Sequence, residues 1–401
     1  MTEEPGSSDG RVAWSAASTL TTGLLGWVTV VVVGRAEGPS VFAAFAVVWG
    51  LFFGVGGSFA GLQQEVTRTV TEADRDGTAP TRLLGPVLGL AVPAVVLVVV
   101  VSLADGGAEQ AAALGLGLLG LALMTFLSGG LAARDAWRSL AVLMTADAVL
   151  RTSAVTVCVV ADRNDLLPWA IAVGAFAWAP LLAVPDVRRA LAAHGRDPVP
   201  VLSRKALAAM ASTGCAALLV AGFPLLVSVA RPGELGSAVG VLLATLILVR
   251  APLLVVLYGF RPVVLRGFLA EGVSVPRAVV RWWVVLGGAG LLGVALAALV
   301  GPSVVRGVFG DGYSSSRTDL ALLAAGSVLL AMLVVSGIAL VALDRHGASV
   351  SGWLTAVVAS LVVLAVPGSD RDALLLACTA GPLVGLAVHA ATLASRPATT
   401  S

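Results

Sequence analysis

Hydrophobic positions in this chain form long unbroken runs, separated by short polar segments. A bilayer core about 30 Å thick needs roughly 20 apolar residues in a helix. Twelve runs of about that length occur, over residues 12–33, 41–62, 83–104, 111–131, 140–161, 166–184, 206–230, 235–260, 282–300, 320–343, 350–366 and 373–393. The pattern predicts an all-α polytopic membrane protein with twelve transmembrane helices and no soluble domain.

The composition agrees with this and excludes other classes of protein. The chain has 401 residues, of which 58% are hydrophobic and 12% charged, and its mean hydropathy is +0.97. Soluble domains are about one quarter charged, and disordered chains have the opposite bias. The net charge of +2 lacks the basic excess of a nucleic-acid-binding protein, so we expect no nucleic-acid partner.

The placement of basic residues predicts the orientation. If the N-terminus is cytoplasmic, seventeen of the 25 basic residues lie in inside segments and six in outside segments. Cytoplasmic loops of membrane proteins are enriched in Lys and Arg. We therefore expect a multi-pass protein of the plasma membrane with both termini in the cytoplasm.

The chain also divides into two halves of six runs each. We expect an N-terminal six-helix bundle over 1–185, a basic cytoplasmic linker over 186–205 and a C-terminal six-helix bundle over 206–401. The tripeptide Ala-Ser-Thr occurs at 17–19 and again at 211–213, near the start of each half. Parallel repeats of this kind form one class of transporters, in which the substrate site lies between the halves.

Ionisable side chains inside the apolar runs are the first candidates for function, because a charge in the hydrocarbon layer is costly unless it is paired or hydrated. Asp147 and Arg151 lie four residues apart in the fifth run, so a helix places them on one face. Two interpretations stay open: a structural ion pair, or a site that faces a wet cavity and that an anionic group can open.

Arg250 in the eighth run has no acidic residue within four positions. It would meet Asp147 or Glu65 across the bundle, or line an aqueous lumen. Arginine keeps its charge and offers a planar fork that suits phosphate, so we expect Arg250 to contact an anion. Pro224 and Pro252 interrupt helical hydrogen bonding within their runs and are candidate hinges.

Small residues mark one helix face in the second run. Gly50, Gly54, Gly57 and Gly61 are spaced four, three and four residues apart. Such a face lets another helix approach closely, and we expect packing here rather than substrate binding.

Several signatures of enzymes are absent from the sequence. There is no Walker A motif, and His194, His346 and His389 are too scattered for a zinc or proton-relay cluster. The three cysteines have no CxxC spacing. We expect no cofactor, no metal site and no enzymatic activity.

Three segments carry a resemblance to a known family. Gly34-Arg35 leads into Phe-Ala-Val-Val at 45–48, Arg-Ala-Pro at 250–252 is followed by Arg-Pro at 261–262, and 308–313 reads Val-Phe-Gly-Asp-Gly-Tyr. The last is similar to a Phe-Gly-x-x-Tyr segment of the family. With twelve spans in two halves, the chain resembles the Wzx-like polysaccharide-biosynthesis flippases of the multidrug/oligosaccharidyl-lipid/polysaccharide (MOP) exporter superfamily.

This resemblance implies a MATE-like bundle with a central cavity that opens alternately to each side. The implied substrate is a lipid-linked glycan, whose diphosphate is held by cavity arginines and whose tail stays among membrane lipid. Arg250 transfers to this role, with Arg151 and Asp147 by position. Glycan-assembly enzymes are the partners that this role implies.

Two other hypotheses stay open. One is a multidrug or small-molecule exporter of the MATE or major facilitator type. However, the segment 71–77, Thr-Glu-Ala-Asp-Arg-Asp-Gly, lacks the leading glycine and trailing basic residues of the major facilitator motif. The other is a non-transporting membrane subunit of a glycan assembly complex.

Overall fold

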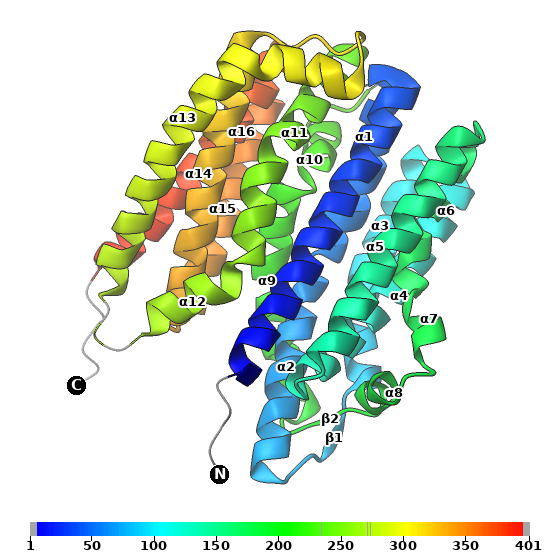
Figure 1. Ribbon diagram of the computed structural model, residues 1–401, viewed down its shortest axis with the longest axis vertical. Helices are drawn as coiled ribbons and strands as arrows, with labels where there is room; N and C mark the ends of the chain where they lie inside the picture. The colour runs from blue at the N-terminus through cyan, green and yellow to red at the C-terminus, as the bar shows by residue number, and fades with distance from the viewer. Residues whose placement is uncertain (1–5, 234, 271, 273, 396–401) are drawn as a thin grey trace. The chain divides into compact units, whose positions relative to one another are not determined.

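A computed structural model describes residues 6–233, 235–270, 272 and 274–395 (Figure 1). Almost all of this part of the chain is helical. Its strands, β1 (Thr81–Arg82) and β2 (His194–Gly195), have two residues each and pair antiparallel. The predicted all-α class is confirmed.

The helices fall into two compact units. Of the described residues, the first unit comprises 6–33 and 48–222, and the second comprises 34–47 and 223–395. The helix α1 (Gly6–Gly56) contributes to both, and Gly38 interrupts it with a φ of 77°. The expected halves 1–185 and 206–401 follow a repeat in the sequence, and this grouping by contacts does not test that division.

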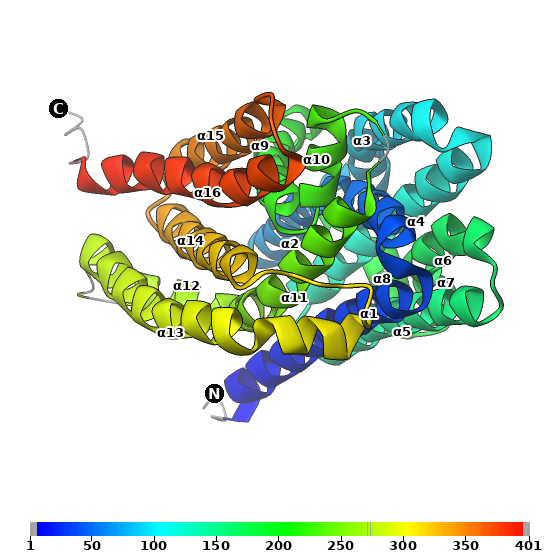
Figure 2. The ribbon, with the colours of Figure 1, turned by 90° about the horizontal axis from the view of Figure 1, so that it is seen from above.

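The first unit holds parts of α1 and the following elements: α2 (Phe59–Asp76), α3 (Leu84–Asp105), α4 (Gly107–Ala133), α5 (Trp137–Val160), η1 (Asn164–Leu166), α6 (Leu167–Val173), η2 (Gly174–Phe176), α7 (Trp178–Leu181), α8 (Pro185–Leu191) and α9 (Val199–Val220). Within it, α4 lies beside α3 and α2, α2 packs on α9, and α5 packs on α6 (Figure 2).

The second unit holds α10 (Phe223–Ala230), α11 (Ser237–Gly259), α12 (Arg261–Leu269), α13 (Val275–Phe309), α14 (Arg317–Ala342), α15 (His346–Ala365) and α16 (Asp370–Ala394). Here α14 contacts α11, α13 and α16, and α15 lies against α16 (Figure 2). The side chain of His389 ties three of these helices together. It hydrogen-bonds the Ser336 hydroxyl on α14 (Nδ1–Oγ 2.8 Å) and donates through Nε2 to the Ser349 carbonyl on α15 (3.2 Å).

The described residues contain nine helical stretches long and apolar enough to cross a membrane, or eleven if two bent pairs each count as one span. The first stretch, Ala16–Asp76, has 61 residues, about three times what one crossing needs. If this stretch counts as two spans and each bent pair counts as one, the total is twelve. The chain is a multi-pass membrane protein, and the number twelve stays a prediction.

Several expected boundaries are wrong. The polar stretch after residue 62 is not a loop, since α2 continues to Asp76. Within α2, Arg68 forms ion pairs with Glu65 and Glu72 that stabilise these half-buried turns. The run 166–184 is broken into η1, α6, η2 and α7, followed by α8 at an angle of 106°. The run 206–230 is interrupted at 221–222. The segment 186–205 contains most of α8 and the start of α9, and its role as a linker between two halves stays a prediction.

The expected glycine face is confirmed as a packing surface. A methyl group on Gly57 would lie 2.3 Å from the Cβ of Ala217, and one on Gly61 would lie 2.3 Å from the backbone nitrogen of Met210. Both partners belong to α9. The absence of side chains here therefore lets α9 pack closely on α2 and on the turn that precedes α2.

Candidate functional site

The candidate site in the first unit lies on the buried face of α5. Asp147 and Arg151 are 6% and 3% exposed, whereas Val157 and Val160 on the same helix are 65% and 81% exposed. This inverts the arrangement of a soluble protein, because the apolar side chains face outward and the charges face inward. It is the pattern expected of a membrane helix with a polar interior face.

The two charges form the ion pair that the sequence predicted. Nη2 of Arg151 donates a hydrogen bond to Oδ1 of Asp147. On the next residue of the helix, the Thr152 hydroxyl lies 2.9 Å from that of Thr29 on α1. A short polar layer therefore runs through this part of the first unit.

Three residues that the sequence analysis did not identify complete the surroundings of the pair. The guanidinium of Arg151 lies over the rings of Phe52 and Phe53, 5.2 and 4.8 Å from their centroids. A methyl group on Gly174 would lie 2.6 Å from Oδ1 of Asp147 and 2.9 Å from Cβ of Arg151. Gly174 therefore lets η2 contact the pair directly. The aromatic dipeptide was visible in the second run, but nothing in its spacing connected it with a residue about 100 positions away.

The ion pair leaves part of the guanidinium unused. Nη1 of Arg151 is buried and has no hydrogen-bond partner among the described residues. A buried polar group without a partner costs about 1–3 kcal/mol, and charged groups cost more. An anionic oxygen that reached this atom would meet a free, charged donor.

A second buried arginine lies in the second unit. Arg250 on α11 is 4% exposed, its Nη2 lies 3.7 Å from Sγ of Cys378 on α16, and its guanidinium lies 5.1 Å from the ring centroid of Phe223 on α10. The acids considered as its partners have other arginines beside them: Asp147 pairs with Arg151, and Glu65 with Arg68. The role of Arg250 as an anion contact stays a prediction.

The two candidate hinges occupy different settings. Pro224 is the second residue of α10, directly after the interruption at 221–222. Pro252 lies inside α11, which continues through it to Gly259. A proline near a helix start removes no internal hydrogen bond, whereas one inside a helix does. Whether either position bends during function stays a prediction.

The sequence analysis also did not identify a network of charges between α2 and the segment before α9. Asp197 accepts hydrogen bonds from Arg68 and from Lys205 (3.0 Å), and its backbone N–H donates to the Thr69 hydroxyl (3.1 Å). Partial burial alone would raise the pKa of the Asp197 carboxyl, but the hydrogen bonds from Arg68 and Lys205 hold that pKa below its usual value. The network fastens the segment before α9 to α2 and is structural.

Among the described residues, no three His, Cys, Asp or Glu side chains gather closely enough to hold a metal ion.

No family model matches the chain. Two curated mycobacterial relatives match nearly all of it. The uncharacterized protein Mb3654 of Mycobacterium bovis is 34% identical over 405 residues, covering 96% of this chain and 93% of the relative. The uncharacterized protein Rv1510 of Mycobacterium tuberculosis is 32% identical over 400 residues, covering 97% and 92%.

Solved structures of the MOP superfamily share the fold. A multidrug resistance MATE family transporter in an inward-facing conformation matches with a TM-score of 0.67 at 16% identity, covering 94% of this chain and 97% of that one. The lipid II flippase MurJ in an inward closed conformation matches with a TM-score of 0.68 at 11% identity, covering 96% and 88%. The MATE-like fold class expected from the resemblance is confirmed. The named structures are a transporter and a flippase.

Proposed function

The chain belongs to the same family as the mycobacterial proteins Mb3654 and Rv1510, and on that premise we propose that it is a membrane flippase. It translocates a lipid-linked oligosaccharide or polysaccharide precursor from the inner to the outer leaflet by alternating access. The likeness of its fold to the flippase MurJ and to MATE transporters supports transport. The single observation that carries the choice of substrate is the free Nη1 donor of the buried Arg151.

The chemistry of that donor favours an anionic headgroup. Asp147 neutralises Arg151 when no substrate is bound, so the pair can stay in an apolar environment. A diphosphate carries several acceptor oxygens and can bind the guanidinium through the free Nη1 without displacing Asp147. An uncharged drug offers no comparable interaction. Arg250 supplies the second cationic group of the proposal, in the second unit.

The repeat expected from the sequence is part of the same proposal, with 1–185 and 206–401 as its two copies. Arg35 and Arg231 occupy matching places after the first run of each half. Arg35 donates to the carbonyls of Gly307 and Val308 (2.7 and 3.0 Å) at the end of α13. Arg231 donates to those of Leu364 and Val366 (2.9 and 2.7 Å) at the end of α15. The similar use of the two arginines at helix C-termini supports the correspondence.

The excess of arginine in alternate loops supports a location in the plasma membrane with both termini in the cytoplasm. In that orientation the substrate would be received where glycans are built on lipid carriers. Membrane lipid and glycan-assembly enzymes would be its surroundings and partners.

The test compares glycan export with drug resistance. A deletion strain should lose a surface glycan and keep its drug susceptibility, and the full-length gene should restore export. Purified protein in vesicles should also move a fluorescent lipid-linked oligosaccharide between leaflets, whereas empty vesicles should not. Unchanged glycan together with altered drug susceptibility would overturn the proposal.

A multidrug or small-molecule exporter is the second candidate, because the fold match to a MATE transporter is as good as that to the flippase. This alternative predicts that the vesicles accumulate a cationic dye and leave the lipid-linked oligosaccharide in place.

A further inference from the structure

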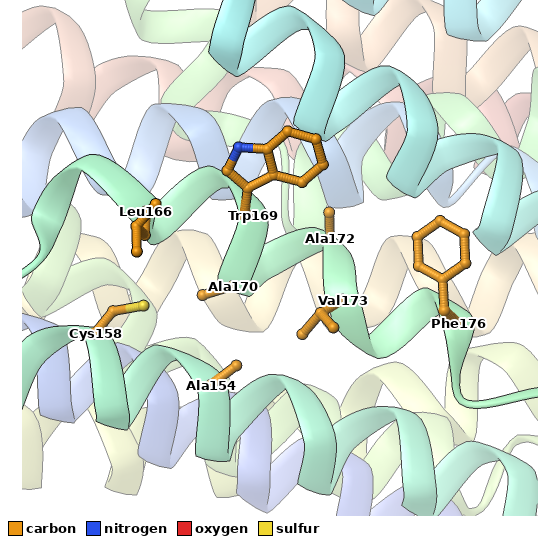
Figure 3. Close-up of a pocket in the computed structure, with 8 residues that line it drawn as sticks. All are labelled: Ala154, Cys158, Leu166, Trp169, Ala170, Ala172, Val173 and Phe176. Carbon is orange, nitrogen blue, oxygen red and sulfur yellow. The ribbon is translucent and has the colours of Figure 1, made fainter. Parts of the chain in front are cut away.

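An apolar groove lies beside the Asp147–Arg151 pair in the first unit (Figure 3). Its volume is about 310 Å³, and α5 lines it with Ala154 and Cys158 while α6 and η2 line it with Trp169, Val173 and Phe176. Ala154 points from α5 towards α6, and Val173 points back towards α5. The volume is at the lower end of the range for ligand pockets, and the lining suits a hydrocarbon.

The groove opens on a surface that lipid would cover. Trp169 and Phe176 on its rim are each 37% exposed, and the neighbouring Val157 on α5 is 65% exposed. In a helix that spans a membrane, such apolar exposure faces the acyl chains of the bilayer. A lipid tail can therefore enter the groove from the side, without passing through water.

The same two walls that form the groove also hold the ion pair. On α5, residues 147, 151, 154 and 158 are spaced four, three and four apart and share one face, so Ala154 lies about 4.5 Å along the axis from Arg151. On the opposite wall, Gly174 contacts both members of the pair, and the preceding residue, Val173, lines the groove. The charged site and the apolar groove are therefore adjacent parts of one interface between α5 and the η2 region.

We propose that this groove binds the hydrocarbon tail of the lipid-linked substrate while Arg151 holds its anionic headgroup. The identity of the substrate rests on the proposed function, whereas the placement of the tail rests on the groove. The position of Arg151 distinguishes this groove from lipid-facing surface elsewhere, because Gly174 lies against its Cβ and the preceding residue, Val173, lines the groove. The long exposed face of α13, with Leu291 and Leu292 at 75% and 64% exposure, offers no such neighbour and serves as the reference for bulk lipid contact.

The test uses a polyprenyl diphosphate with a photoreactive diazirine on its tail, bound to the full-length protein in lipid nanodiscs. We expect cross-links concentrated on peptides containing residues 154–158 and 166–176, at least tenfold above those on 291–292 of α13. Uniform labelling of all exposed helices would show bulk lipid contact alone and would overturn the proposal.

Three variants on α5, two of which introduce the same side chain, make the test specific. Ala154→Trp fills the groove and should weaken binding of the polyprenyl diphosphate at least tenfold, with Ala154→Leu giving a smaller loss. Val157→Trp adds the same side chain to the exposed face outside the groove and should bind as the wild-type protein does. Size-exclusion profiles and melting temperatures of all three variants verify folding. If a folded Ala154→Trp protein bound the polyprenyl diphosphate as tightly as the wild-type protein does, the groove would not be the binding site of the tail.

The failure of the groove and the failure of the proposed function give different results. Inorganic diphosphate should compete with the probe at the headgroup site, and the uncharged polyprenol should compete at the groove but less well than unlabelled polyprenyl diphosphate. If diphosphate competes but Ala154→Trp has no effect, headgroup recognition stands and the tail site is wrong. If the neutral polyprenol competes as well as unlabelled polyprenyl diphosphate does, the anion-binding role of Arg151 fails with the proposed function.

Discussion

The buried arginines of the two units differ in how their charge is accommodated. Arg151 receives its carboxylate from its own helix, one turn earlier, and stacks on two phenylalanine rings from α1. Arg250 contacts a ring from α10 and a thiol from α16, so its described neighbours come from other helices. The first site is therefore a pair that a single helix carries as a neutral unit, whereas the second depends on the assembled second unit. The two sites share one feature, since in each of them the guanidinium packs on the face of an aromatic ring.

The largest effect should come from breaking the pair on α5. Asp147→Asn removes the carboxylate and leaves the Arg151 charge buried, which should lower the free energy of unfolding by about 3–5 kcal/mol. Melting temperatures in detergent micelles would measure this. The double variant Asp147→Asn/Arg151→Gln removes both charges and should recover most of the loss. If the single variant were as stable as the wild type, the pair would not be an ion pair that the fold depends on.

The second prediction concerns transport through Arg250. Arg250→Ala should reduce the flipping rate in vesicles at least tenfold, about 1.4 kcal/mol of activation free energy, while the protein still inserts into the membrane. Arg250→Lys keeps the charge but loses the planar fork, and should give an intermediate rate. A wild-type rate for the alanine variant would remove Arg250 from the transport mechanism.

A third prediction compares the aromatic partners. Phe223→Leu removes the ring beneath Arg250 and should lower stability by about 1–2 kcal/mol, since cation–π contacts are strongest when desolvated. Phe53→Leu should have a smaller effect, below about 1 kcal/mol, because Phe52 still lies against Arg151. Leucine keeps both positions apolar and of similar size. Thermal unfolding of the two variants side by side measures the difference, and the reverse order would contradict the comparison.

The smallest effect should come from the network around Asp197, which lies outside both arginine sites. Because the folded-state pKa of this carboxyl is lowered, its stabilising effect is complete above the unfolded-state pKa of about 3.9 and is lost as the pH falls through the folded-state value. Asp197→Asn should cost less than about 1 kcal/mol at pH 7 and should flatten the loss of stability below pH 4. Melting temperatures of both proteins between pH 3 and pH 7 test this. An unchanged acid-side slope would exclude Asp197 as its source.

Sequence periodicity predicted what depends on neighbouring positions along one helix. The pairing of Asp147 with Arg151 follows from a spacing of four residues, and the packing of Gly57 and Gly61 follows from their shared face. Helix ends were predicted less well. The ion pairs of Arg68 extend α2 through a polar stretch, and short breaks divide the run 166–184, because local contacts there outweigh average hydropathy.

By itself, the sequence therefore determined the class of protein and the residues that carry charge into the membrane. Bilayer thickness fixes the length of an apolar run, and the helical repeat fixes which residues of that run share a face, so both can be recognised from consecutive residues. Only the tertiary structure decided what surrounds those charges. The rings of Phe52, Phe53 and Phe223, the contact at Gly174 and the groove beside Ala154 join positions from different helices. The physical reason is that an apolar side chain gives no local signal of its partner, because burial is non-directional until packing fixes which surfaces meet.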